Sequence, residues 1–172
     1  MPTRETPQQY IKRILGYLGE GKPLAVQAAT PQKIARLVRG VPLGKLRRRP
    51  APGKWSVAEI LAHLAETELV GGYRTRMILG KSGTPIQAFD QDAWAREGNY
   101  ARRNPKESLE AFTAIRRANL SLLTQLKPAQ WKKYGRHEER GKESIEKIAS
   151  FFAGHDINHI RQIERILGRK SR

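Results

Sequence analysis

The chain has 172 residues, 38% of them hydrophobic and 7% aromatic, which suits one domain with a core of moderate size. Its formal net charge is +17, from 33 basic and 16 acidic side chains, so its field attracts nucleic acids and acidic solutes. The absence of cysteine excludes disulfides, thiolate metal ligands and a cysteine nucleophile, and leaves nitrogen and oxygen as the donors for any metal.

No apolar run reaches the roughly 20 residues that a membrane-spanning helix needs. The first seven residues, Met-Pro-Thr-Arg-Glu-Thr-Pro, lack the hydrophobic segment of a signal peptide. We therefore expect a cytoplasmic protein with a single domain over residues 1–172 and a basic tail at about 168–172.

Two helix-start signals mark the first part of the chain. Thr6 precedes a proline, with Gln9 three residues after it, as in a capping box, and apolar residues with helical spacing follow. Thr30-Pro31 repeats the start signal. We predict a first bundle helix over 7–39 that is kinked or broken around 19–29, with two separate helices as the alternative.

The most clearly specified helix follows a basic loop at 40–54. Ser56 and Glu59 have the spacing of a capping box, and the apolar spacing after them predicts a helix to about residue 79. His63 lies at the border of the apolar stripe of this helix. Such a position suits either a half-buried histidine or one that faces a cavity.

Segment 84–104 is predicted to be a long connection with a short helix around 90–96. Its Asp90 and Asp92 lack the glycine and the distal glutamate of a calcium loop, so caps on the surface are the favoured interpretation. Because the connection is long, the helices on either side of it need not be antiparallel neighbours.

A further helix is predicted from Asn104-Pro105 to about residue 126, followed by a brief turn through 127–131. Residues 134–142 form a polar connection with His137 inside it. The favoured interpretation of His137 is a solvated or salt-bridged side chain, and the alternative is a contribution to the rim of a site. No alternation typical of strands is visible, so the long helices predict an all-α four-helix bundle.

The last predicted helix, about 144–167, carries two histidines on one face. His155 and His159 are four residues apart, so they stand one above the other within the apolar stripe. Two imidazoles so placed can bind one metal ion if a third ligand comes from a neighbouring helix. The alternative is a pair of buried histidines with satisfied hydrogen bonds.

Three further residues are candidates for a catalytic role. Asp156 points toward the core, where an unpaired carboxylate is costly. It could accept a hydrogen bond from a ligand histidine and fix its tautomer, or belong to a structural salt bridge or cap. Glu66, one turn beyond His63, is a candidate general base, and Gln162 a candidate for the rim of a pocket.

Two segments together carry a family resemblance. The first is Pro-Ala-Pro-Gly-Lys-Trp-Ser-Val-Ala-Glu-Ile-Leu-Ala-His at 50–63, and the second is Gly-His-Asp-Ile-Asn-His-Ile-Arg-Gln at 154–162. In this order and at this separation they resemble the DinB-like family, the DinB/YfiT-like candidate metalloenzymes. The similarity in kind extends over nearly the whole chain.

The resemblance implies a four-helix bundle of up-down-down-up topology and a divalent metal ion, nickel or zinc, held by three histidines. On this sequence the ligands would be His63, His155 and His159. Three protein ligands leave at least one coordination position open, as in catalytic rather than structural sites.

The resemblance also implies a metal-dependent enzyme, either a hydrolase or a thiol-dependent S-transferase acting on a small molecule. Several characterised members of the wider family use low-molecular-weight thiols such as bacillithiol or mycothiol, and many others have no known reaction. Here any thiol would have to come from the substrate because the chain has no cysteine. The alternative is a non-catalytic, stress-related binding protein whose basic surface engages nucleic acid. Against it, the densest basic run, 45–49, has no interleaved aromatic residues on which bases could stack. No membrane partner is expected, and a homodimer through the bundle faces stays open.

Overall fold

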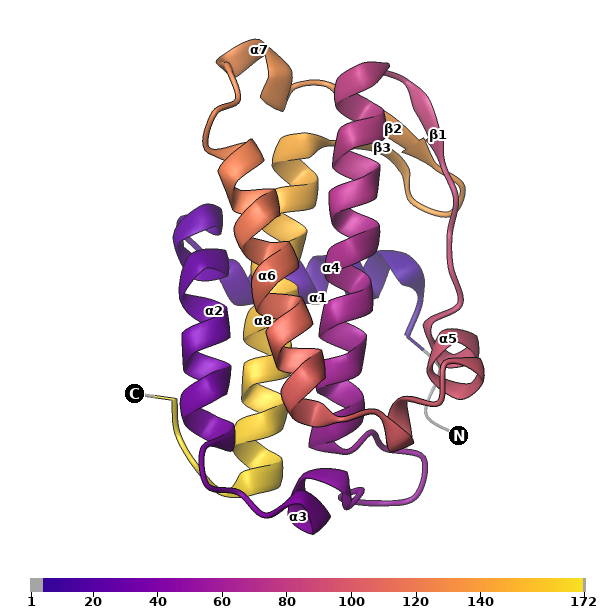
Figure 1. Cartoon of the computed structure of the whole chain (residues 1–172). Coiled ribbons are helices and arrows are strands. Elements are labelled where there is room, and N and C mark those ends of the chain that lie inside the picture. The colour runs from indigo at the N-terminus through magenta and orange to yellow at the C-terminus, as the bar shows by residue number, and fades with distance from the viewer. Residues whose placement is uncertain (1–4, 172) are drawn as a thin grey trace.

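Within residues 5–171, which the computed structural model describes, four long helices form the bundle: α2 (Pro23–Val38), α4 (Val57–Gly80), α6 (Pro105–Leu123) and α8 (Ile145–Leu167). In Figure 1, α2 and α8 run in one direction, and α4 and α6 run in the other. α4 packs beside α6, and α2 beside α8, so each of these close pairs is parallel. The predicted up-down-down-up bundle is therefore confirmed, including the crossover that the long connection permits.

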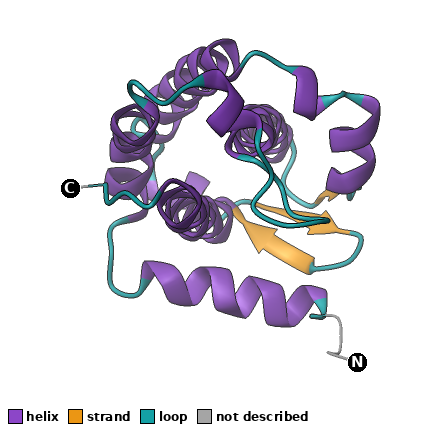
Figure 2. Cartoon of the chain, turned by 90° about the horizontal axis from the view of Figure 1, so that it is seen from below, coloured by secondary structure: helices purple, strands orange, loops and turns teal. Residues whose placement is uncertain are grey.

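The N-terminal segment forms two helices, which is the alternative that the sequence allowed. α1 (Pro7–Leu18) begins at the predicted capping box and crosses the bundle over α8 (Figure 2). α2 begins at Pro23, so the start signal at Thr30-Pro31 was wrong. The Thr30 hydroxyl donates to a carbonyl one turn earlier in the same helix and does not cap a new one.

Short elements occupy the connections. They are α3 (Leu43–Arg47), α5 (Gln91–Glu97), the 3-10 helix η1 (Tyr100–Arg102) and α7 (Pro128–Trp131). Asp90 caps α5 by accepting hydrogen bonds from the backbone of Asp92 and Ala93, as predicted for a surface cap. The predicted basic tail follows α8, and its last residue, Arg172, lies outside the described residues.

A small sheet corrects the prediction that the chain has no strands. It consists of β1 (Thr84–Ile86), β2 (Tyr134–His137) and β3 (Gly141–Ser144), with β1 parallel to β2 and β2 antiparallel to β3. Figure 2 shows the sheet beside the bundle. Strands of three or four residues are too short for an alternating pattern to stand out from the sequence.

Two apolar clusters form the core. One lies around Ile60, Phe112 and Ile163, and the other around Ile78 and Ile145 near the sheet. Between them, buried polar residues occupy the middle turns of α4 and α8. These polar turns contain the candidate site. Within the described residues, no helix is both long and apolar enough to span a membrane.

Candidate metal centre

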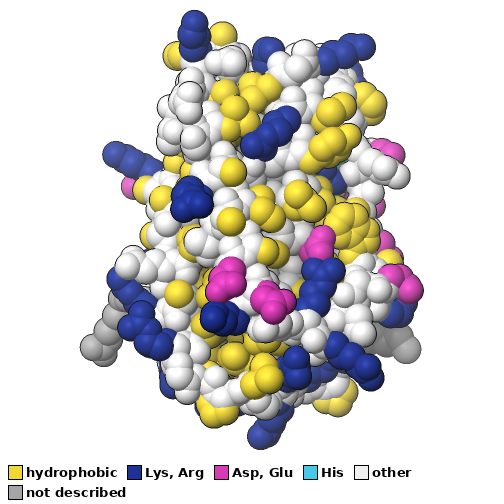
Figure 3. Space-filling model, viewed as in Figure 1, with side chains coloured by type: hydrophobic (Ala, Val, Ile, Leu, Met, Phe, Trp, Pro, Cys, Tyr) yellow, Lys and Arg dark blue, Asp and Glu magenta, His cyan; other side chains and the backbone are white. Residues whose placement is uncertain are grey.

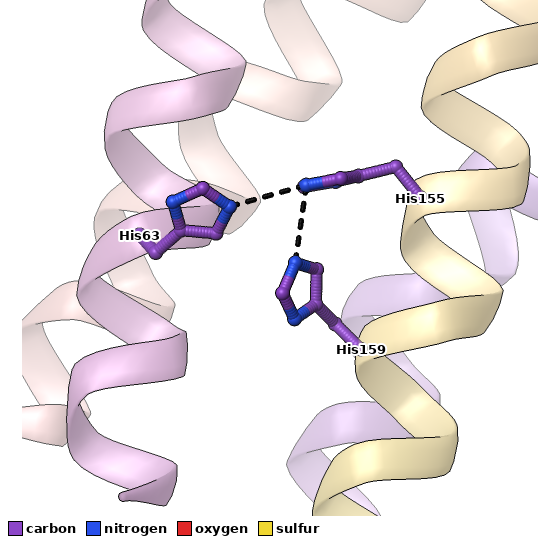
Figure 4. Close-up of side chains that lie close together, drawn as sticks. All are labelled: His63, His155 and His159. Atoms are coloured by element: carbon purple, nitrogen blue, oxygen red, sulfur yellow. Dashed lines mark hydrogen bonds between the residues drawn. The ribbon is translucent and has the colours of Figure 1, made fainter. Parts of the chain in front are cut away.

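The three predicted ligand histidines meet where α4 and α8 face each other. Nε2 of His155 lies 3.1 Å from Nε2 of His63 and 3.1 Å from Nε2 of His159 (Figure 4). One ligand nitrogen from each ring can be chosen so that all three lie within 4.8 Å of one another. Nitrogen ligands at about 2.05 Å from a tetrahedral ion are about 3.3 Å apart, so the cluster has the dimensions of a metal site.

Helix boundaries fix where these rings stand. Ser56 and Glu59 form the predicted capping box, which sets the first turn of α4 two turns before His63. The buried carboxylate of Glu59 is also held by Arg49 from the preceding loop. At the other helix, Ser144 caps the start of α8. The ligand helices are therefore anchored at their own beginnings, and all three candidate ligands stand on these helices.

Neighbouring side chains orient the rings. Oε1 of Gln162 lies 3.0 Å from Nδ1 of His159, so an N–H at Nδ1 donates to the amide and the lone pair is left on Nε2, toward the cluster. The Thr67 hydroxyl lies 3.3 Å from the ring nitrogens of His63. Trp55 packs against His63 with ring centroids 4.8 Å apart. Gln162 thus contacts a ligand histidine and also lines a cavity beside it.

The cluster is neutral at neutral pH. Burial lowers the pKa of His63 and His155 well below the usual value, and it lowers the pKa of His159 to about 4. Neutral imidazoles keep the lone pair that binds a cation, whereas protonated ones do not. Burial thus prepares all three rings to bind a metal ion without first losing a proton.

Asp156 belongs to a separate buried network. Its two carboxylate oxygens lie 2.5 and 3.0 Å from the guanidinium of Arg116 on α6, which also pairs with Glu68 on α4 at 2.8 Å. Asp156 makes no hydrogen bond to a ligand ring, so the salt-bridge interpretation is confirmed and the proposed bond to a histidine is wrong. Burial raises the pKa of Asp156, against the opposing effect of Arg116. The network ties α4, α6 and α8 together beside the histidines.

Glu66 stands apart from the cluster. Its carboxylate pairs with Arg103, which follows η1. A role as general base stays a prediction.

His137 and Arg116 are two of the buried polar residues that sequence reasoning placed wrongly or missed. His137 is 3% exposed and lies in β2, so the solvated interpretation was wrong. Arg116 is 1% exposed. A signal for it was present, because Phe112 and Arg116 are four residues apart and share one face of α6.

Two cavities are lined by different histidines of the cluster. One, of about 740 Å³, is lined by His63 and His155, and the other, of about 570 Å³, by His159 and Gln162. Tyr10 of α1 lines both cavities. The cluster is therefore buried in protein and still accessible to a small molecule.

Known proteins resemble this chain in sequence and in fold. A family model described as the DinB superfamily matches residues 28–163. A candidate metal-dependent hydrolase from Oceanobacillus iheyensis is 29% identical over 119 residues, which are 69% of this chain and 68% of that protein. The candidate metal-dependent hydrolase YfiT from Bacillus subtilis is 23% identical over 86% of this chain and 85% of its own length. The solved structure of YfiT, described as a probable metal-dependent hydrolase with an unusual four-helix bundle topology, superposes with a TM-score of 0.77 and 20% identity, and covers 99% of this chain and 94% of its own.

Proposed function

This chain belongs to the DinB superfamily, and we propose that it is a metal-dependent hydrolase whose divalent ion is held by His63, His155 and His159. The observation that carries the proposal is the convergence of three buried, neutral imidazoles at distances that suit one ion. The hydrolase names of the relatives support the same reaction class.

The donor set favours zinc or nickel. Three imidazole nitrogens suit borderline metals of this kind, and the chain offers no thiolate that would select a softer ion. Bound there, such an ion would lower the pKa of a coordinated water toward ~7 and polarise a carbonyl oxygen. Gln162 would keep His159 in the tautomer that presents Nε2. Trp55, Phe151 and other rings around the cluster would restrict water around a bound substrate.

The nucleophile decides between hydrolysis and S-transfer. With no cysteine in the chain, a transfer to sulfur would need a free thiol as co-substrate, whereas hydrolysis needs only water.

Nucleic-acid binding has less support. Figure 3 shows Lys and Arg scattered over the visible face and interspersed with other side chains, without one continuous patch.

The metal content of protein purified without an affinity tag tests the proposal. We expect about one zinc or nickel ion per chain, and its loss in His63→Ala because two imidazoles on one helix are too few for a stable site. His137→Asn is the matched control, since it removes a histidine outside the cluster and should leave the ion in place. An ion retained by His63→Ala, or lost equally from both variants, contradicts the assignment.

Turnover is tested separately with the metal-loaded protein. Hydrolysis of simple esters and amides is compared with S-alkylation of low-molecular-weight thiols by an electrophile. Thiol conjugation without any hydrolysis would reassign the protein as a transferase.

A further inference from the structure

The cavity above His63 and His155 has a basic wall that the metal centre does not use. Arg74 from α4, His137 from β2 and Arg140 from the turn between β2 and β3 line the same cavity as the two ligand histidines. These three side chains, called the basic wall below, place two guanidinium groups and one imidazole in the lining of the cavity.

Arg74 carries a positive charge without a counter-ion. Among residues 5–171 no carboxylate forms an ion pair with it, and its contacts are the backbone carbonyl of Gln87 and the ring of Phe89, 5.6 Å away. Burial lowers the pKa of Arg74 to about 10, and the nearby charge of Arg140 contributes to the shift. A half-buried guanidinium that has no ion-pair partner is stabilised by an anion that reaches it.

Arg140 is only partly neutralised. Its Nε and Nη2 bind the two oxygens of Glu143 at 3.0 and 2.9 Å, which leaves Nη1 as a spare donor. With Arg140 and Glu143 paired, Arg74 is the cation of this wall that forms no ion pair with a described residue, although the carboxylates of Glu138 and Glu139 lie near Arg74 and His137. One unpaired guanidinium matches a monoanion such as a carboxylate better than a dianionic phosphate.

His137 adds a neutral donor of defined orientation. Its Nδ1 accepts a hydrogen bond of 3.2 Å from the backbone N–H of Glu139, so the ring proton is on Nε2. Among the described residues nothing accepts from this N–H, although the side chain is 3% exposed. Burial lowers the pKa of His137, and the nearby charges of Arg140 and Arg74 lower it further, while those of Glu143 and Glu139 raise it.

Phe151 sets the spacing between the basic wall and the metal centre. The Cζ of Arg140 lies 5.5 Å from the centroid of the Phe151 ring, which in turn stacks on His155 at 6.0 Å. An anion bound to the basic wall would thus be separated from the candidate metal ligand His155 by about the width of one aromatic ring.

Four carboxylates also line the cavity. Glu5 is paired with Arg13, and Asp90 caps α5. The other two are Asp92 in the first turn of α5 and Glu139, whose backbone N–H donates to His137.

We propose that the basic wall of Arg74, His137 and Arg140 binds the carboxylate of the substrate, and that the substrate is a small N-acyl or O-acyl acid whose carbonyl reaches the metal centre. The inference rests on the proposed function for the reacting carbonyl, whereas the carboxylate site depends on the wall alone. The aromatic side chains of Phe89, Phe151 and Phe152 in the same cavity favour an aromatic or other apolar acyl group.

Calorimetric titration with hippurate (N-benzoylglycine) tests the proposal, with hippuramide as the neutral analogue of equal shape. Binding is measured with and without zinc, and zinc content is measured in parallel. We expect hippurate to bind at least about tenfold more tightly than hippuramide, since a hydrogen bond to a charged group contributes about 1.5–3 kcal/mol. Preference for hippurate without zinc would support the wall even if the metal assignment failed, and zinc binding without that preference would leave the metal centre standing and overturn the wall.

Arg74→Met should remove about a tenfold to a hundredfold of the hippurate affinity and leave zinc content unchanged. Arg117→Met removes an exposed arginine on α6 that does not line this cavity, and is the matched control. The double change Arg140→Gln with Glu143→Gln removes the second guanidinium without leaving a buried carboxylate unpaired, and should also weaken binding. Equal affinity for hippurate and hippuramide, no saturable binding at millimolar concentration, an unaffected Arg74→Met, or tighter binding of phenyl phosphate would each overturn the proposal.

Discussion

At the scale of single residues, the site depends on burial that keeps imidazoles neutral and on neighbours that aim them. His159 shows both effects, because burial lowers its pKa to about 4 while Gln162 holds its Nδ1. Substitution of a residue that contacts a ligand histidine usually changes the metal affinity, although that residue does not touch the metal. Gln162 is the clearest such residue here.

Gln162→Met should weaken metal binding about 10- to 100-fold, because it removes the acceptor for Nδ1 at nearly constant side-chain volume. Gln162→Glu keeps an acceptor and should retain the affinity of the unmodified protein. Competition with a chromophoric chelator measures both constants. Equal affinity in the Met variant and the unmodified protein would show that Gln162 does not orient the ring.

The ligand histidines could be predicted from the sequence, and the partner of Asp156 could not. His155 and His159 share a helix face by local geometry, and His63 was added by a motif resemblance. The bond between Asp156 and Arg116, by contrast, joins residues 40 positions apart on different helices. Only the assembly of the bundle, which brings Arg116 of α6 to Asp156 of α8, decides that this carboxylate meets a guanidinium and not an imidazole.

At the scale of the elements, the crossing of α1 over α8 needs a residue without a side chain. A Cβ at Gly154 would lie 2.0 Å from the carbonyl oxygen of Ile14, and backbone atoms cannot yield as a flexible side chain can. This crossing brings Tyr10 over both cavities. Helix positions could be predicted from caps and periodicity, but neither the crossing nor the three short strands had a local signal of comparable strength.

Gly154→Ala should lower the free energy of unfolding by about 3 kcal/mol, the upper range for overpacking, because α1 must move away from α8. Gly16→Ala is the matched control on α1, where an added Cβ meets nothing within 4 Å. It should be neutral or stabilising by up to about 1 kcal/mol, since alanine favours a helix over glycine. Urea unfolding followed by circular dichroism measures both, and a Gly154→Ala protein as stable as Gly16→Ala would contradict the close approach.

At the scale of the whole molecule, the bundle carries three neutral histidines in its interior, and this couples its stability to pH. Each of them has a lowered pKa in the folded state. Below the ordinary histidine pKa of about 6.5, the unfolded chain therefore binds more protons than the folded protein does. As far as these three groups are concerned, the free energy of unfolding is therefore highest above about pH 6.5 and decreases as the pH falls below that value. The pKa of His137 is lowered as well and acts in the same direction.

For the metal-free protein we expect the free energy of unfolding to fall by up to about 4 kcal/mol per pH unit below pH 6, about 1.4 kcal/mol from each histidine of the cluster. Urea midpoints at pH 7.5, 6.0 and 5.0 measure the slope. His63→Gln should reduce it by about a third. A stability that does not change over this range would mean that the rings can take up protons in the folded state.

The separation of the ligands along the chain also bears on how the fold is reached. His155 and His159 lie about one turn apart on α8, whereas His63 is 92 positions from His155. His63 stands on α4, which forms a parallel pair with α6 through the long connection between them. Closing so long a loop costs entropy before any contact rewards it, so the third ligand arrives late in assembly. An ion bound to the early pair would do little to hasten folding. Once the ion also binds His63, it would link the two ends of that loop. The stabilisation by the ion would then appear mainly as a slower unfolding rate and thus a longer lifetime of the native state.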